Sequence, residues 1–334
     1  MNSLLEMKHV AVNFAVYGST VQAVRDISFS IEEGQTVALV GESGCGKSIT
    51  AKSIMGLVKK PGKVMEGSQI IFDGVDVTGY SAKEWKKFRG KECSMIFQDA
   101  LVSLNPTMKI GKQIMESLDN HASELSAEEK KKKVIEMLKL TGIADAESCL
   151  QKYPHELSGG MRQRIMIAIA LISHPKLLIA DEPTTSLDVT IQAQILSQMK
   201  ELQKQMNMAI LLITHDLGIV ADIADKIVVM YAGKIVEEGT VREIFYDSVH
   251  PYTKALLNSV PRLDREGKQM LQTIEGNIPD MTNPPKGCAF CERCPYAMNI
   301  CAQYMPEEQT LSPSHRAACW LMDERAGKDG ANNG

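Results

Sequence analysis

Partial alternation of apolar and polar residues marks two stretches near the N-terminus, residues 7–16 and 24–31, which are rich in Val, Ile and Phe. This pattern is typical of β-strands that bury one face. Residues 36–40 form a short apolar run, which indicates a central strand buried on both sides. A glycine-rich loop follows this run, and the pattern then predicts a helix that starts near Lys47 and ends near Leu57.

The middle of the chain, roughly residues 110–154, has the pattern of helices. Ser126 and Glu129 match a capping box, in which the N-cap serine is followed three residues later by a glutamate. The apolar residues after this box fall on one face of the predicted helix; they are Val134, Met137 and Leu138. We therefore expect an amphipathic helix there.

Short apolar runs at residues 177–180 and 210–214 indicate further strands, and residues 190–206 between them have a helical pattern. This alternation of strands and helices predicts a parallel α/β core. Two turn sequences between apolar runs, Asp73-Gly74 and Ala232-Gly233, predict β-hairpins.

The composition of the chain changes after residue 260. Seven of the chain's 13 prolines lie beyond it, in the last quarter of the sequence. We therefore place a domain boundary near residue 260. Residues 325–334 are polar and rich in Gly and Asn, so we expect them to be disordered.

The chain has 334 residues, with 37 Lys and Arg against 41 Asp and Glu, which gives a net charge of −4. This balance offers no basic excess for nucleic acid, and we expect no nucleic-acid partner. No apolar run approaches the ~20 residues of a membrane helix, and no secretory signal is visible at the N-terminus. We therefore expect a cytoplasmic protein whose membrane role would depend on partners.

Residues 41–48, Gly-Glu-Ser-Gly-Cys-Gly-Lys-Ser, fit the phosphate-binding pattern G-x-x-x-x-G-K-[ST]. Glycines let backbone N–H groups approach and surround phosphates, and the following helix directs its positive end toward them. Lys47 is expected to reach the β- and γ-phosphates of ATP, and the Ser48 hydroxyl to bind Mg²⁺.

Two carboxylates end the apolar run at residues 177–182, Leu-Leu-Ile-Ala-Asp-Glu. In phosphate-loop enzymes a carboxylate at this place holds Mg²⁺, and we assign that role to Asp181. Glu182 would then polarise the water that attacks the γ-phosphate.

A second anion site is predicted at residues 157–164, Leu-Ser-Gly-Gly-Met-Arg-Gln-Arg. Ser158 is expected to be a helix N-cap, and Gly159 and Gly160 expose backbone N–H groups at the start of that helix. A single ATP does not need two such sites in one chain. We therefore expect Ser158 to contact an ATP that is bound to another copy or to a partner.

These motifs make residues 1 to about 245 resemble the ATP-binding cassette (ABC) transporter ATPases. The resemblance implies catalytic roles for Gln98, which would also contact Mg²⁺, and for His215, which would contact the γ-phosphate. It implies that Asp188 lies in the loop that links two ATPase subunits, and that Tyr17 stacks on adenine. The residues expected to bind the nucleotide are completed by Gly41, Ser43, Gly44, Cys45, Gly46, Lys47, Ser48 and Ile49.

The chain is also similar to the oligopeptide and dipeptide importer subgroup, in the motifs around Gln98, at residues 184–190 and at His250-Pro-Tyr-Thr. The resemblance implies a phosphate-loop NTPase core with an antiparallel β subdomain and a helical signature subdomain at about residues 100–165. The ABC ATPase domain would span residues 1–260, and a subgroup-type extension rich in Cys and Pro would span residues 261–324.

The same resemblance implies the partners. These are a second ATPase subunit, two transmembrane permease subunits and an extracellular solute-binding protein, on the cytoplasmic face of the cell membrane. A heterodimer with a related ATPase subunit is favoured, and a homodimer is possible. The solute is expected to be a di- or oligopeptide, with nickel or a glycoside as alternatives. A soluble ABC ATPase that acts on ribosomes or DNA is disfavoured, because the chain has one cassette and no sustained heptads.

Five cysteines lie within 32 residues near the C-terminus: Cys288, Cys291, Cys294, Cys301 and Cys319. A cytosolic chain disfavours disulfides, whereas zinc and a [4Fe–4S] cluster both accept four thiolates. In the subgroup, a cluster uses the positions that match Cys288, Cys294, Cys301 and Cys319. We therefore predict a [4Fe–4S] cluster on those four, with zinc as the alternative, Cys291 as a spare thiol and His315 as a supporting residue.

Overall fold

The structure is a computed structural model that describes residues 3–98, 103–185, 187–259 and 274–324. The chain divides into two compact parts. The terminal part contains Leu5–Ser30, Val37–Thr78 and the chain from Thr214 onward, and the middle part contains Ile31–Thr36 and Gly79–Ile213, with the residues up to Leu4. The predicted disordered tail at residues 325–334 and the predicted boundary at residue 260 lie outside the described residues.

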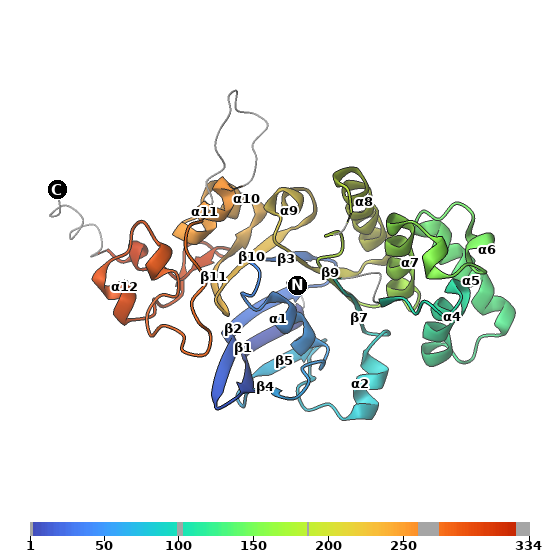
Figure 1. The fold of residues 1–334 in the computed structure, drawn as a ribbon, viewed down its shortest axis with the longest axis horizontal. Helices are drawn as coiled ribbons and strands as arrows, with labels where there is room; N and C mark the ends of the chain where they lie inside the picture. The colour runs from blue at the N-terminus through green and yellow to red at the C-terminus, as the bar shows by residue number, and fades with distance from the viewer. Residues whose placement is uncertain (1–2, 99–102, 186, 260–273, 325–334) are drawn as a thin grey trace, which may run out of the picture. The chain divides into compact units, whose positions relative to one another are not determined.

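An antiparallel sheet forms one layer of the terminal part (Figure 1). Its strand order is β2-β1-β5-β6, and β4 pairs with β1. The turn Asp73-Gly74 joins β5 to β6 with φ angles of 49° and 77°, so the predicted hairpin is confirmed. The strands are β1 (Ser3–Val16), β2 (Ser19–Glu32), β4 (Gly62–Val64), β5 (Gln69–Phe72) and β6 (Val75–Asp76).

A second run of strands in the terminal part follows the order β12-β13-β11-β10-β3. The strand β3 (Thr36–Val40) is buried along its whole length and lies parallel to β10 (Lys226–Tyr231). Ala232-Gly233 turns β10 into the antiparallel β11 (Lys234–Thr240), as predicted. The helices of this part are α1 (Lys47–Ile54), α9 (Leu217–Ile223), α10 (Val241–Tyr246) and α11 (Pro251–Asn258).

The middle part has three parallel strands, β7 (Cys93–Ile96), β8 (Leu177–Asp181) and β9 (Ala209–Thr214), in the order β7-β8-β9. The predicted parallel α/β core is therefore confirmed. Most of its helices follow β7 along the chain, and Figure 1 shows α4 to α7 gathered together in green. The helices are α2 (Ala82–Phe88), α4 (Ile110–His121), α5 (Ala127–Leu140), α6 (Ala146–Cys149), α7 (Gly159–Leu171) and α8 (Val189–Met206), with the 3₁₀ turn η1 (Pro154–Glu156).

Helix α5 has the capping box and the buried apolar face that its sequence predicts. The Ser126 hydroxyl accepts the N–H of Glu129 at 3.3 Å, and the Glu129 carboxylate accepts the N–H of Ser126 at 2.8 Å. This capping box satisfies two backbone donors that a helix start leaves unpaired. The three apolar residues predicted on one face are buried.

Helix α1, by contrast, ends at Ile54, three residues before the predicted end, because Gly56 adopts a positive φ of 58°.

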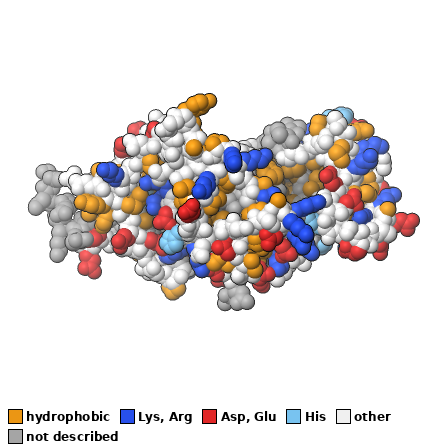
Figure 2. Space-filling model, turned by 90° about the horizontal axis from the view of Figure 1, so that it is seen from below, with side chains coloured by type: hydrophobic (Ala, Val, Ile, Leu, Met, Phe, Trp, Pro, Cys, Tyr) orange, Lys and Arg blue, Asp and Glu red, His pale blue; other side chains and the backbone are white. Residues whose placement is uncertain are grey.

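Within the described ranges, no helix has the length and apolar character that a membrane span requires. On the face seen in Figure 2, basic and acidic side chains are interspersed. This agrees with the nearly balanced charge of the sequence.

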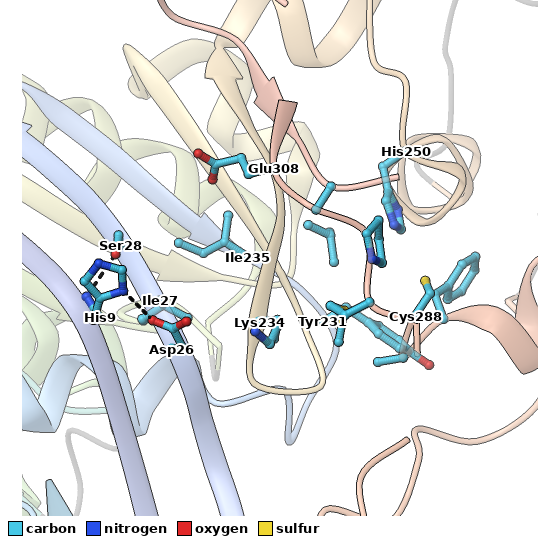
Figure 3. Close-up of a pocket in the computed structure, with 16 residues that line it drawn as sticks. His9, Asp26, Ile27, Ser28, Tyr231, Lys234, Ile235, His250, Cys288 and Glu308 are labelled. Carbon is cyan, nitrogen blue, oxygen red and sulfur yellow. Dashed lines mark hydrogen bonds and ion pairs between the residues drawn. The ribbon is translucent and has the colours of Figure 1, made fainter. Parts of the chain in front are cut away.

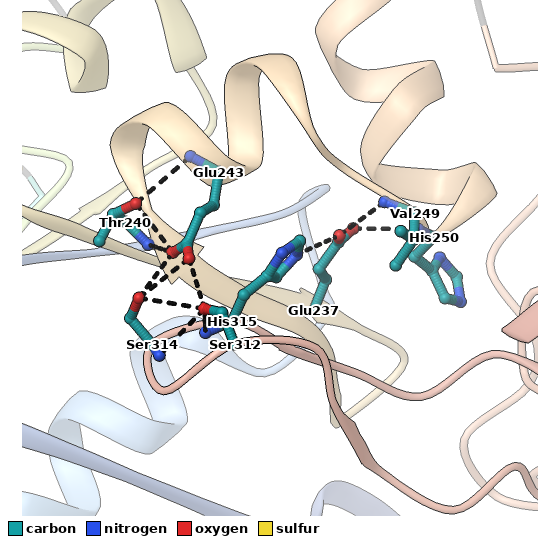
Figure 4. A network of polar contacts seen from close by, with 8 residues as sticks. All are labelled: Glu237, Thr240, Glu243, Val249, His250, Ser312, Ser314 and His315. Carbon is teal, nitrogen blue, oxygen red and sulfur yellow. Dashed lines mark hydrogen bonds and ion pairs between the residues drawn. The ribbon is translucent and has the colours of Figure 1, made fainter.

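The C-terminal segment, residues 274–324, joins the terminal part as an addition to its sheet. Its short strand β13 (Arg316–Ala317) pairs with β11, and β12 (Gln309–Thr310) pairs with β13. Polar contacts reinforce this edge (Figure 4). His315 Nε2 lies 2.9 Å from the buried Glu237 Oε1. The other elements of the segment are η2 (Cys291–Arg293), α12 (Asn299–Gln303) and η3 (Trp320–Met322).

An aromatic cluster anchors the same segment. Phe290 is 1% exposed. Its ring centroid lies 5.2 Å from that of Tyr231 and 5.3 Å from that of Tyr252. Edge and tilted contacts at these distances are favourable beyond the area they bury. The segment therefore shares an apolar core with β10 and α11.

The predicted [4Fe–4S] cluster, with its zinc alternative, is wrong. In the part of the chain that the structure describes, no three His, Cys, Asp or Glu side chains are placed to hold a metal ion. Strand pairing and the Phe290 cluster hold the segment instead. His315 supports Glu237, and Cys291, Cys294 and Cys301 are free thiols.

We expect Phe290→Ala to release the C-terminal segment. The change leaves a cavity against Tyr231 and Tyr252, and a buried Phe→Ala change costs about 3–5 kcal/mol. Limited proteolysis with mass spectrometry would report faster cleavage after residue 274. Tyr296→Ala, at an exposed aromatic residue, is the matched control and should leave the cleavage rate unchanged. Equal protection of both variants would contradict the anchoring role of Phe290.

Candidate ATP site

The loop of residues 41–48, here called the phosphate loop, connects β3 to α1 and adopts a backbone that requires glycine. Gly41 has a φ of 152° and Gly46 a φ of 106°. A Cβ at Gly41 would overlap the carbonyl oxygen of Met230, and one at Gly46 would lie 2.5 Å from that of Ala23. The glycines therefore let the loop lie directly on neighbouring backbone.

The outer side of the phosphate loop is open. A Cβ at Gly44 would meet no atom within 4 Å, and Ser43 is exposed. Helix α1 begins at Lys47 and has no side-chain cap. A helix start without a side-chain cap, preceded by a glycine loop, suits an anion such as phosphate.

Lys47 is buried and lies over its own loop. Its Nζ donates hydrogen bonds to the carbonyl oxygens of Gly41 at 2.7 Å and Glu42 at 3.0 Å. The Cys45 Sγ lies 3.8 Å from the same Nζ. Burial raises the pKa of the Cys45 thiol, so it stays neutral beside the ammonium. These contacts hold the Lys47 charge at the loop.

Three other predicted residues also belong to the terminal part. Ile49 lies in the first turn of α1. Tyr17 is fully exposed at the turn between β1 and β2. His215 is exposed directly after β9, where the Asp216 side chain accepts the N–H of Gly218 at 2.9 Å and caps α9.

In the middle part, Asp181 and Glu182 stand at the carboxyl end of β8. Asp181 is buried. Glu182 has a positive φ of 47°, which is strained for a residue with a side chain. Its N–H donates to the Ile213 carbonyl oxygen of β9 at 2.9 Å, which helps to hold this backbone.

Two side chains hold the Glu182 carboxylate. Gln98 Nε2 donates to Glu182 Oε2 at 2.8 Å, and Thr185 Oγ1 donates to the same oxygen at 2.9 Å. The structure therefore brings Gln98 and Glu182 together. Thr185 was missed by the sequence reasoning, although its place three residues after Glu182 in a tight turn was a usable signal.

Ser158 and Asp188 are both helix caps at the surface of the middle part. Ser158 Oγ accepts the N–H of Met161 at 3.3 Å at the start of α7, as predicted. Asp188 Oδ1 accepts the N–H of Ile191 at 2.9 Å at the start of α8. A Cβ at Gly160 would lie 3.1 Å from Ile191 Cγ2. The two helix starts therefore lie close together.

A separate cavity of about 430 Å³ lies in the terminal part, and residues of β1, β2, the β10–β11 hairpin and the C-terminal segment line it (Figure 3). His9 Nδ1 lies 2.9 Å from Asp26 Oδ1 on its rim. No phosphate-loop residue lines the cavity.

His250, on the wall of this cavity, has its pKa lowered to about 4 by burial. Its Nδ1 accepts the N–H of Tyr252 at 3.1 Å and caps α11. The His-Pro-Tyr-Thr motif is therefore structural at His250.

The comparison with known proteins gives close relatives. The chain is 53% identical to the oligopeptide transport ATP-binding protein OppD of Bacillus subtilis over 97% of its own length and 90% of the relative's. It is 51% identical to the dipeptide transport ATP-binding protein DppD of the same organism, over 98% and 97%. The chain belongs to the ATP-binding proteins of ABC transporters.

Further comparisons agree with this family. A family model of the ABC transporter matches residues 24–185, and one of the oligopeptide/dipeptide transporter C-terminal region matches residues 236–301. A solved dimeric ATP-binding cassette, bound to ADP and phosphate after hydrolysis, aligns with a TM-score of 0.64 and 26% identity. The alignment covers 71% of this chain and 99% of the cassette. The expected ABC ATPase fold is thus confirmed, and the chain is an ABC-type ATPase.

The groups present fit the ATP and Mg²⁺ that ABC ATPases use. The open phosphate loop with the Lys47 ammonium suits polyphosphate. Ser48 in the terminal part offers a hydroxyl, and Asp181 in the middle part offers a carboxylate; each is a kind of oxygen ligand that Mg²⁺ accepts.

We expect Thr185→Val to lower kcat about fivefold, because one hydrogen bond to the Glu182 carboxylate is lost while the shape of the side chain is kept. The KM for ATP should stay unchanged, since the lost hydrogen bond orients the Glu182 carboxylate. Steady-state ATPase assays would measure both constants. Thr190→Val, at an exposed threonine in the first turn of α8, is the control. An unchanged kcat in Thr185→Val would contradict the role of this hydrogen bond.

Proposed function

We propose that this ABC ATPase drives the import of di- or oligopeptides through partner permeases, from the cytoplasmic face of the membrane. The observation that carries the proposal is the identity of about half of all residues, over nearly the full length, to peptide-transport ATP-binding proteins. The match of residues 236–301 to the C-terminal region of oligopeptide/dipeptide transporters supports it.

In the proposed reaction, the backbone of the phosphate loop and Lys47 bind the ATP phosphates, and Tyr17 stacks on adenine. Mg²⁺, when bound by Ser48, Asp181 and Gln98, would neutralise phosphate charge. Glu182 accepts a proton from the attacking water, and His215 contacts the γ-phosphate. The hydrogen bonds from Gln98 and Thr185 to Glu182 support this role, because they fix the orientation of the carboxylate.

We further propose that Ser158, Gly159, Gly160 and Asp188 act on an ATP held by a second ATPase subunit. Their exposure, or partial exposure, at two adjacent helix starts supports this. The second subunit is a related chain or another copy of this one. Two permease subunits and an extracellular solute-binding protein complete the proposed importer.

Uptake by cells tests the transported solute. In cells that lack this chain, we expect the wild type to restore uptake of a radiolabelled tripeptide. We expect Glu182→Gln to fail, because the amide keeps the shape but cannot accept a proton, which lowers turnover about 100-fold or more. Purified Glu182→Gln should still bind ATP, whereas Lys47→Ala should bind it at least about tenfold more weakly. Restored uptake of nickel or a glycoside without peptide would overturn the proposed solute, and wild-type turnover by Glu182→Gln would overturn the assigned base.

Mixed dimers test the action of Ser158 on a neighbouring ATP. Ser158→Arg damages the signature of one subunit, which is the helix start at Ser158, Gly159 and Gly160, and Lys47→Ala damages the phosphate loop of the other. If each site combines the loop of one subunit with the signature of its partner, a mixed dimer keeps one intact site. ATPase activity of the mixture should then exceed that of either variant alone. If the partner is a related chain, Lys47→Ala is made at the equivalent lysine there. No recovery in verified mixed dimers would contradict the shared site.

A further inference from the structure

Glu42, the second residue of the phosphate loop, forms a bidentate ion pair with Arg293 of the C-terminal segment. Arg293 Nη1 donates to Glu42 Oε2 at 2.6 Å, and Arg293 Nη2 donates to Glu42 Oε1 at 2.9 Å. The arginine side chain is 5% exposed and the glutamate side chain 26%. Bidentate pairs of this kind fix geometry as well as charge, and little solvent is present to screen this one.

The Arg293 guanidinium is fully occupied. Besides the two bonds to Glu42, its Nη1 donates to Tyr231 Oη at 3.2 Å, its Nη2 to the Ile274 carbonyl at 2.9 Å and its Nε to the Glu275 carbonyl at 2.9 Å. These five acceptors match the five N–H groups of an arginine. The carboxylate of Glu42 raises the pKa of Arg293. The charged guanidinium is thus held in one orientation by five hydrogen bonds.

Contacts within the C-terminal segment and with Tyr231 fix the position of the Arg293 side chain. Arg293 ends the 3₁₀ turn η2, and its N–H donates to the Phe290 carbonyl at 3.0 Å. The guanidinium carbon lies 5.7 Å from the ring centroid of Tyr231 and 5.9 Å from that of Phe290. The aromatic cluster that anchors the segment therefore also orients the Arg293 side chain toward the phosphate loop.

A second contact holds the backbone of Glu42 itself. Its N–H donates to the hydroxyl of the buried Tyr252 at 2.8 Å. The ring centroids of Tyr252 and Tyr231 lie 4.6 Å apart. Both ends of Glu42 are thus held by one cluster, which α11, β10 and the C-terminal segment build together.

We propose that Arg293 is a positioning residue for ATP binding, which couples the C-terminal segment to the phosphate loop through Glu42. Two physical effects follow from its contacts. The ion pair fixes the start of the loop in the shape that directs N–H groups at phosphate, and it neutralises a carboxylate that would otherwise repel the ATP anion. The inference rests on the assignment of residues 41–48 as the loop that binds ATP.

A double-mutant cycle tests the coupling. We expect Arg293→Gln to raise the KM for ATP about tenfold with kcat nearly unchanged, because the Glu42 carboxylate is left unpaired beside the phosphates. Glu42→Gln combined with Arg293→Gln should recover most of the loss, since the repelling charge is gone. A residue that only held the segment in its fold would show no such rescue.

Arg316→Gln is the matched control, because Arg316 lies in the same segment and pairs with Glu238 at 2.8 Å and Glu308 at 2.7 Å, and not with the loop. Its KM should equal that of the wild type. If Arg293→Gln does not fold, Arg293→Lys, which keeps the charge and loses the fork, should raise the KM about threefold.

Two outcomes separate the inference from the function on which it rests. An unchanged KM in the folded Arg293 variant, or no rescue in the double variant, overturns the coupling while Lys47→Ala still weakens ATP binding. If Lys47→Ala leaves ATP binding unchanged, the assigned loop itself is wrong, and the coupling falls with it.

Discussion

The phosphate loop cannot stabilise itself, and much of the terminal part follows from this constraint. Its backbone N–H groups must remain directed at an anion, and its glycines contribute no side-chain packing. The loop is therefore held from outside. A fully buried strand precedes it, the Gly233 N–H donates to the Cys45 carbonyl at 2.9 Å, and Tyr252 and Arg293 hold Glu42. Gly41 and Gly46 meet the carbonyls of Met230 and Ala23 so closely that no larger residue fits.

At the carboxyl end of β8, Glu182 is likewise held by the groups around it. Glu182 takes up a positive φ, which costs of order 1–3 kcal/mol for a residue with a side chain. Such strain persists only where the surroundings fix it, and here the Ile213 carbonyl, Gln98 and Thr185 do so. Strain of this kind is concentrated at functional sites. Glu182, the proposed base, is thus held by three groups, and two of them, Thr185 and the Ile213 carbonyl, have no role of their own in the proposed reaction.

Sequence reasoning succeeded where the cause of a structure is local. The turns Asp73-Gly74 and Ala232-Gly233 and the Ser126 capping box depend on neighbours within a few positions. The contacts of Glu42 do not, because Arg293 lies 251 residues away. The cysteine prediction failed for a related reason. Spacing along the chain does not tell whether cysteine side chains are placed to hold a metal ion, and in the described part of the chain no group of three is so placed.

The link between Glu42 and Arg293 also joins two regions that match different family models. Glu42 lies in the match to the general ABC transporter model, and Arg293 lies in the match to the oligopeptide/dipeptide C-terminal region. A solved cassette is covered over 99% of its length by 71% of this chain, so a cassette forms without the remainder. An ion pair that reaches into the phosphate loop gives the C-terminal region a direct physical contact with that loop. A segment that served only as a surface appendage would not need to direct a buried, five-fold hydrogen-bonded arginine at that loop.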